Sequence, residues 1–230
     1  MIKAILFDLD NTLTDTFSIK VKCISESIKK MIESGLDMTF TQAYDLIMNV
    51  YKKSDFESTS IFQDFLKKAI GRIDYKILSA GIVEYRKIRF NHVKPYPHIK
   101  NVLKNLRKNN ELIIGILTDS PKLKAWIRLT SIGLVDYFDL ILTYEDVKKK
   151  KPNNKGFKKA IKLLKLKPSE ILFIGDIPYK DIRGAKSVGM KTALAKYGQF
   201  LKGDDEPDYV LNSPKDLLKI IKFENKKKVI

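Results

Sequence analysis

Short runs of apolar residues recur along the chain, and the later runs are followed by stretches with helical periodicity. A strand that is covered on both faces shows a continuous apolar run, so these runs predict buried strands. The clearest runs lie at 4–7, 112–117, 140–142 and 171–174, with shorter candidates at 192–195 and 209–211.

Amphipathic helices are expected between these strands. Apolar residues spaced i, i+3, i+4, i+7 predict a helix with one buried face, and this spacing occurs at 99–106, at 157–164 and after Pro214. A further helix is expected at 182–188. Alternating strands and helices build an α/β domain, so we expect a doubly wound, Rossmann-like core with a mostly parallel sheet.

The segment between the first two strands shows only helical periodicity, and it is too long to be a simple crossover. We therefore expect an inserted α-helical cap at 16–93 and a core domain formed by 1–15 and 94–230. Prolines at 95 and 97 favour an extended return link. Hinges near 14–17 and 93–97 would let the cap open and close over the core.

Composition adds a strong positive charge to this picture. The 230 residues carry a formal net charge of +17, with one run of four lysines at 148–151. No nucleic-acid-binding signature accompanies the lysines, so nucleic acid is not expected as a partner. Solvated surface lysines are the simplest interpretation, and a field that attracts phosphorylated substrates is the alternative. No apolar run is long enough to span a bilayer, and the single Cys23 favours a cytoplasmic protein.

The first predicted strand ends in two aspartates, Asp8 and Asp10. Ligands of open α/β domains bind at the carboxyl ends of the strands. Residues i and i+2 of a strand point the same way, so one carboxylate could act as a nucleophile and the other as a proton carrier. The alternative is a turn in which an Asp or Asn side chain caps the following segment.

A second acidic cluster, Gly175-Asp176 with Asp181, follows the strand at 171–174. Gly175 would let the backbone approach a ligand closely. Carboxylates from neighbouring strands repel one another unless a cation lies between them, and oxygen ligands favour Mg²⁺. Alternatively, Asp181 caps the next helix.

Two further segments suit a phosphate group. Thr118 and Asp119 end the second predicted strand where a helix is about to begin, and hydroxyls and backbone N–H groups at such a place bind anions. Lys151, which precedes Pro152, could neutralise a nucleophile and phosphoryl oxygens together.

Taken in order, these segments resemble the four motifs of the haloacid dehalogenase-like (HAD) superfamily. The matching residues are Asp8-Leu9-Asp10-Asn11-Thr12, Thr118, Lys151-Pro152, and Gly175-Asp176 with Asp181. The helical insert resembles the cap of the family's subfamily I. Motif form and spacing are most similar to archaeal Mg²⁺-dependent phosphatases, a group that includes glyceraldehyde 3-phosphate phosphatases.

This resemblance implies an enzyme that hydrolyses small phosphate monoesters through an aspartyl phosphate on Asp8. Asp10 would be the acid and base, and Thr118, Asp119 and Lys151 would bind the phosphoryl group. Mg²⁺ would be held by the carboxylates of Asp8 and Asp176 and by the backbone carbonyl of Asp10. Asp181 would complete the metal site through water or by orienting its neighbours.

Two other functions stay open at this stage. A phosphomutase of the same superfamily would share every core residue and differ only in protecting the aspartyl phosphate from water. A basic nucleic-acid-binding module is the remote alternative, and it would have no need of four converging carboxylates.

Overall fold

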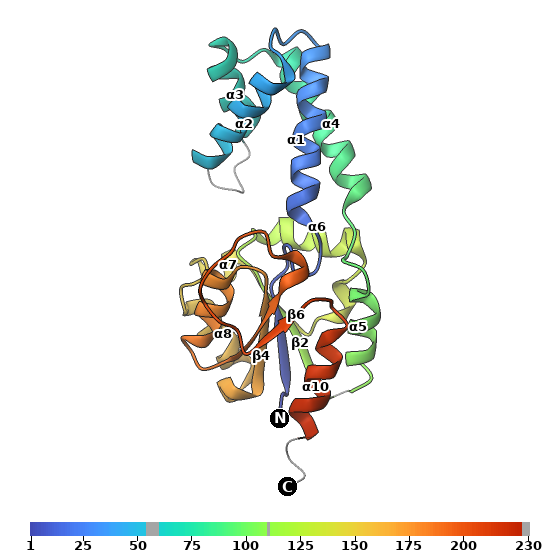
Figure 1. Cartoon of the computed structure of the whole chain (residues 1–230), viewed down its shortest axis with the longest axis vertical. Coiled ribbons are helices and arrows are strands. Elements are labelled where there is room, and N and C mark those ends of the chain that lie inside the picture. The colour runs from blue at the N-terminus through green and yellow to red at the C-terminus, as the bar shows by residue number, and fades with distance from the viewer. Residues whose placement is uncertain (54–59, 110, 227–230) are drawn as a thin grey trace. The chain divides into compact units, whose positions relative to one another are not determined.

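The computed structural model describes residues 1–53, 60–109 and 111–226. By its internal contacts the chain divides into two compact units. Unit 1 comprises Met1–Thr16 together with Lys94–Ile230, and unit 2 comprises Phe17–Val93. In Figure 1, unit 2 is the group of blue to green helices labelled α1 to α4, and unit 1 contains the strands.

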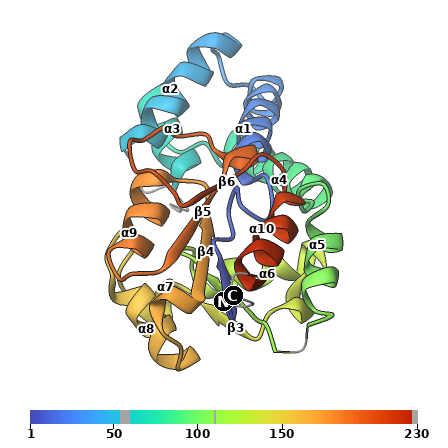
Figure 2. The same ribbon diagram turned by 60° about the horizontal axis from the view of Figure 1, so that its bottom comes forward.

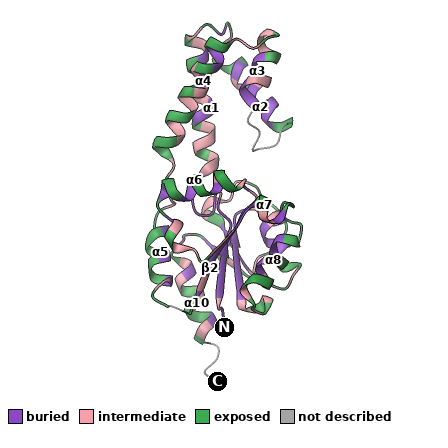
Figure 3. Cartoon of the chain, turned by 180° about the vertical axis from the view of Figure 1, so that it is seen from behind, coloured by how far each residue is buried: buried purple, intermediate pink, exposed green. Residues whose placement is uncertain are grey.

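Unit 1 is built on a parallel sheet of six strands in the order β3-β2-β1-β4-β5-β6. The central strand β1 pairs with β2 on one side and with β4 on the other. Figure 3 shows that the strands are largely buried, as continuous apolar sequences require. The strands are β1 (Ala4–Phe7), β2 (Ile113–Leu117), β3 (Leu140–Leu142), β4 (Ile171–Gly175), β5 (Lys191–Ala195) and β6 (Tyr209–Leu211). The expected doubly wound fold is confirmed.

Helices cover both faces of this sheet (Figure 2). One face carries α5 (Ile99–Leu106), α6 (Lys122–Ile132) and α10 (Asp216–Lys226), and the other carries α7 (Tyr144–Val147), α8 (Lys155–Leu164) and α9 (Arg183–Lys186). On the second face, Phe157 of α8 packs edge-on against Phe173 of β4 with ring centroids 5.0 Å apart. Short 3₁₀ turns lie at Val135–Tyr137, Pro168–Glu170 and Lys196–Gly198.

The helix expected at 182–188 takes a different form. The chain first makes a π-helical turn, Pro178–Ile182, and only then the short helix α9. Inside this turn the Asp181 carboxylate accepts a hydrogen bond from the Ile177 backbone N–H at 3.0 Å. The wide turn thereby directs Asp181 back toward the end of β4, an arrangement that apolar periodicity does not encode.

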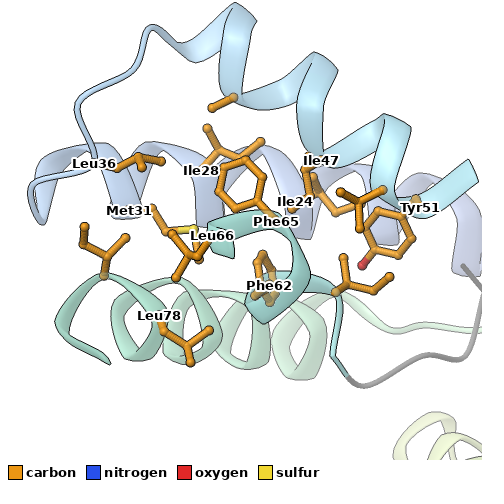
Figure 4. Packing of buried hydrophobic residues seen from close by; sticks show 14 residues of the cluster. Ile24, Ile28, Met31, Leu36, Ile47, Tyr51, Phe62, Phe65, Leu66 and Leu78 are labelled. Atoms are coloured by element: carbon orange, nitrogen blue, oxygen red, sulfur yellow. The ribbon is translucent and has the colours of Figure 1, made fainter. Parts of the chain in front are cut away.

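Unit 2 consists of four helices, α1 (Thr16–Glu33), α2 (Phe40–Lys53), α3 (Ile61–Ile70) and α4 (Tyr75–His92). Figure 4 shows that apolar side chains from all four point into one shared interior. Asp74 caps α4 by accepting hydrogen bonds from two backbone N–H groups of its first turn. Gly81 leaves room for Met31, because a Cβ there would lie 2.4 Å from the methionine Cε.

The two chain segments at the edge of unit 1 that border residues 17–93 are joined to each other. The Thr14 hydroxyl donates to the Lys94 carbonyl at 2.6 Å, and the Tyr96 N–H donates to the Leu13 carbonyl at 2.9 Å. These bonds hold the start and the return of the insertion side by side. Among the described residues, none of the helices has the length and apolar character that crossing a membrane requires.

Candidate active site

The carboxyl ends of three neighbouring strands bring polar side chains together. Asp8 follows β1, Thr118 follows β2 and Asp176 follows β4. Backbone bonds continue the sheet one residue beyond the apolar runs, since the Asp8 N–H donates to the Ile174 carbonyl at 2.8 Å. The strands therefore fix the backbone positions of these residues.

Lys151 joins two of the carboxylates into a buried cluster. Its Nζ lies 2.6 Å from Asp8 Oδ1 and 2.6 Å from Asp181 Oδ1. Asp176 completes the group, and one carboxylate oxygen from each aspartate lies within 4.8 Å of the others. Three buried carboxylates thus share one ammonium group, so the cluster has less positive than negative charge.

The pKa values of the cluster reflect this imbalance. Burial, opposed by Lys151 and reinforced by Asp181 and Asp10, raises the pKa of the Asp8 carboxyl to about 7. Burial and the charges of Asp8 and Asp181 raise the pKa of Asp176 to about 9. Burial lowers the pKa of the Lys151 ammonium, but the surrounding carboxylates outweigh burial and hold it well above its usual value.

An unsatisfied atom shows where the missing positive charge would lie. Asp176 Oδ2 is fully buried and has no hydrogen-bond partner among the described residues. Its other oxygen has only a long contact, 3.5 Å from the Thr12 hydroxyl. A buried carboxylate oxygen without a partner is costly. This group of carboxylate oxygens with a charge deficit fits a divalent cation, with Asp8 and Asp176 as the residues that would hold it and Asp181 beside them.

Gly175 provides the space for this arrangement. A Cβ at this position would lie 2.3 Å from Asp181 Cγ. The Asp181 carboxyl group therefore occupies the space that a side chain at position 175 would need. Asp181 also does not cap α9, because its two oxygens are bound to Lys151 and to the Ile177 N–H.

Asp10 points to different partners. Both of its carboxylate oxygens accept hydrogen bonds from Arg128 Nη1, and Oδ2 also accepts one from the Ser120 hydroxyl at 2.7 Å. The side chain of Asp10 is therefore absent from the cluster of Asp8, Asp176 and Asp181. A metal contact by Asp10 could come only through its backbone carbonyl, as the family resemblance implied.

The turn that follows Asp10 is capped by Asn11 rather than by either aspartate. Asn11 has a φ of 56°, which asparagine tolerates better than most residues. Its Oδ1 accepts hydrogen bonds from the backbone N–H and hydroxyl of Thr16 at 3.0 and 3.1 Å. The capping role that was the alternative for this motif therefore belongs to Asn11, and Asp8 and Asp10 have other partners.

The remaining candidates lie beside the cluster. The Thr118 hydroxyl is buried and accepts a hydrogen bond from the Ser120 N–H at 3.2 Å. The Asp119 carboxylate accepts one from the Lys151 N–H at 2.9 Å and so positions the lysine loop. Any phosphate contact of Asp119 would therefore come from its backbone. Of the four consecutive lysines, only Lys151 is buried.

Sequence reasoning missed Arg128 and the bond between Ser120 and Asp10. A signal for Arg128 did exist. It follows Ala125 by three residues and precedes Ile132 by four, so it occupies the buried stripe of α6. A charged residue on such a stripe calls for a partner inside the protein.

Comparisons with known proteins identify the family of the chain. Residues 5–195 match the family model described as haloacid dehalogenase-like hydrolase. A glyceraldehyde 3-phosphate phosphatase from Methanocaldococcus jannaschii is 34% identical over 224 residues, covering 96% of this chain and 98% of that protein. A pyrophosphatase PpaX from Halalkalibacterium halodurans is 31% identical over 229 residues, covering 96% and 97%.

A solved structure shows the same fold. The crystal structure of a HAD phosphatase from Thermococcus onnurineus matches with a TM-score of 0.71 and 27% identity, covering 96% of this chain and 98% of that one. The family model spans most of the sequence and includes both carboxylate segments of the site. The chain therefore belongs to the haloacid dehalogenase-like hydrolases and is an enzyme of that family.

Proposed function

We propose that the chain is a Mg²⁺-dependent phosphatase that hydrolyses small phosphate monoesters through an aspartyl phosphate on Asp8. The observation that carries the proposal is the charge deficit of the buried cluster, with Asp176 Oδ2 left unpaired beside Asp8 and Lys151. A divalent cation would satisfy both features, and its charge would let an anionic phosphoryl group bind beside the carboxylates. The names of the relatives, a phosphatase and a pyrophosphatase, agree with phosphoryl chemistry.

Asp8 suits the role of nucleophile. Its Oδ1 is bound to Lys151, whereas its Oδ2 accepts no hydrogen bond from the described residues. That oxygen would attack phosphorus as the bond between phosphorus and the ester oxygen breaks. Lys151 would hold the nucleophile in place and bind a phosphoryl oxygen, and the Thr118 hydroxyl would donate to another.

Asp10 would move the proton in both half-reactions. It would give a proton to the departing ester oxygen and later take one from the water that hydrolyses the aspartyl phosphate. Mg²⁺, held by the carboxylates of Asp8 and Asp176 and by the Asp10 carbonyl, would offset the negative charge of the phosphoryl group. Asp181 would orient Lys151, with which it shares a 2.6 Å contact.

Phosphate release from p-nitrophenyl phosphate, measured with Mg²⁺ and with EDTA, tests this proposal. Turnover should require the metal and should be lost in Asp8→Asn. Asp136→Asn, the same change on an exposed 3₁₀ turn, is the matched control and should keep wild-type activity. Metal-independent turnover, or full activity of Asp8→Asn, would contradict the proposed mechanism.

The substrate requires a second measurement. Glyceraldehyde 3-phosphate and pyrophosphate are the first compounds to test, because relatives carry those names. A sugar phosphate with a bisphosphate primer belongs in the same panel. Isomer formation without phosphate release would identify a mutase instead of a phosphatase. We expect soluble phosphorylated metabolites as the partners of the site.

A further inference from the structure

Arg128 is a buried cation that the proposed reaction does not yet use. It lies on the inner stripe of α6, and its side chain is 5% exposed. Its Nη1 donates hydrogen bonds to both oxygens of Asp10 and to the Ser120 hydroxyl, the last at 3.1 Å. Asp10 is the carboxylate that neutralises Arg128 among the described residues.

Packing alone does not account for an arginine at this position. The neighbouring positions on the stripe are filled by Ala125, Leu129 and Ile132, and an apolar side chain would continue the stripe. Taking a guanidinium out of water is costly, and replacing a buried ion pair by apolar residues is often neutral or stabilising. An ion pair kept here at the carboxylate of Asp10 points to a role in the reaction.

We propose that Arg128, together with Ser120, is a positioning residue that holds Asp10 to accept the proton of the hydrolytic water. This inference rests on the proposed function, because it assigns a holder to the acid–base residue of that mechanism. Arg128 itself neither attacks phosphorus nor carries the proton. It acts by fixing where the Asp10 carboxylate lies.

The hydrogen bonds identify which oxygen would take the proton. An ionised carboxylate oxygen accepts about two hydrogen bonds. Asp10 Oδ2 already accepts from Ser120 and Arg128, whereas Oδ1 accepts from Arg128 alone. Oδ1 therefore keeps one acceptor site. The Asp10 side chain is 26% exposed, so water can reach its carboxylate.

Ser120 connects this carboxylate to the phosphoryl side of the site. Its hydroxyl binds Asp10, and its backbone N–H donates to the Thr118 hydroxyl at 3.2 Å. The residue proposed to bind the phosphoryl group and the residue proposed to activate water are thereby held by one serine. Displacement of a reacting group by about 1 Å can cost two orders of magnitude in rate.

In the step concerned, the water oxygen bonds to phosphorus and the bond between phosphorus and the Asp8 carboxylate oxygen breaks. The water proton passes to Asp10 Oδ1, and Asp8 is released as a carboxylate with inorganic phosphate as the product. No oxidant or further reactant is needed. Loss of Arg128 should therefore slow the breakdown of the aspartyl phosphate more than its formation.

Rapid-quench kinetics with p-nitrophenyl phosphate separates the two steps. p-Nitrophenolate is a good leaving group, so its release needs little help from an acid, and the phosphorylated protein is counted by mass spectrometry after acid quench. In Arg128→Met, breakdown should fall roughly ten- to hundredfold while formation changes less than about threefold. The phosphoenzyme should then accumulate. Arg128→Lys should recover part of the breakdown rate.

Two further variants complete the test. Lys122→Met removes a cation from the exposed start of the same helix and should leave both rates unchanged. Ser120→Ala should show the effect of Arg128→Met in weaker form, which keeps the test valid if Arg128→Met does not fold. Thermal unfolding of every variant reports on folding.

Equal losses of formation and breakdown in both Arg128→Met and Ser120→Ala, without accumulation of phosphoenzyme, would overturn the positioning role. That result would leave the phosphatase mechanism intact. If the wild-type protein releases phosphate but never carries a phosphoryl group under acid quench, the proposed intermediate fails, and the inference fails with it.

Discussion

Two charged clusters of unit 1 lie at opposite ends of its sheet. At the amino ends of β5 and β6, Glu224 of α10 is bound by the Lys191 ammonium and by the Tyr209 hydroxyl. At the carboxyl ends of β1 and β4, Asp8, Asp176 and Asp181 share the single Lys151. The first cluster pairs one carboxylate with one cation, and the second is short of positive charge.

This difference separates a structural ion pair from a candidate active site. Each cluster contains a buried carboxylate, so burial of a charge does not distinguish them. What distinguishes the second is an unsatisfied oxygen, Asp176 Oδ2, and carboxyl groups whose pKa values are raised. Such strain is tolerated where a ligand relieves it, and perturbed carboxyl groups gather at functional sites for this reason.

The largest expected effect contrasts one carboxylate from each cluster. Asp8→Asn should reduce turnover roughly 10⁴-fold or more, because the nucleophile is lost. It should not destabilise the metal-free protein, because it removes charge that the cluster cannot balance. Glu224→Gln should keep activity and lose about 2 kcal/mol of unfolding free energy. Steady-state assays measure the activities, and chemical denaturation measures the stabilities. A Glu224→Gln variant that is inactive but stable would contradict the assignment of Glu224 to a structural ion pair.

A glycine offers the next test. In Gly175→Ala the new Cβ would fall 2.3 Å from Asp181 Cγ, so the carboxyl group must move. Displacing a residue that orients a metal site typically costs ten- to hundredfold in metal affinity or activity, so the Mg²⁺ concentration needed for half-maximal turnover should rise by about that factor. An unchanged Mg²⁺ requirement would show that Asp181 has no part in metal binding.

Stability should depend on pH and Mg²⁺ together. The folded pKa values of about 7 for Asp8 and about 9 for Asp176 exceed their usual values. The folded metal-free protein thus keeps protons that the unfolded chain releases. Its stability therefore falls as pH rises from the ordinary aspartate pKa of 3.8 to about 7 for Asp8 and to about 9 for Asp176. Mg²⁺ replaces those protons, so the stabilisation that it adds should grow from about pH 5.5 to about pH 8.5.

Thermal unfolding with Mg²⁺ and with EDTA at several pH values measures this increment. Asp176→Asn should remove most of it, and Glu224→Gln should retain it. An increment that is the same at all pH values would mean that the ion binds away from the cluster.

The smallest effect concerns the lysine run. Lys149 is exposed and lies two residues before Lys151, and exposed charges are strongly screened. Lys149→Gln should change kcat/KM by less than about twofold, and added salt should abolish the difference. A tenfold loss that persists at high salt would instead place Lys149 in direct contact with the substrate.

Much of the fold was predictable from sequence because the strands of unit 1 are buried on both faces. Continuous apolar runs marked all six strands, and the i, i+3, i+4 pattern marked the four helices of unit 2. The π-helical turn at Pro178–Ile182 was not predicted, because its shape depends on the bond between Asp181 and the Ile177 N–H.

The candidate site was predictable to the extent that its residues close strands. Asp8, Thr118 and Asp176 occupy such positions, and parallel strands carry them to one edge. Arg128 escaped prediction because its partner Asp10 is 118 residues away in sequence. Pairings of that kind depend on the tertiary fold, and periodicity shows only that a charge lies on a buried stripe.

The most direct test of the charge deficit is a crystal structure of the protein grown with Mg²⁺. An ion bound to Asp8 and Asp176, with Asp176 Oδ2 as a direct ligand, is the expected result. Magnesium elsewhere on the protein, with Asp176 Oδ2 hydrogen-bonded to a protein group or to a buried water, would contradict the central claim.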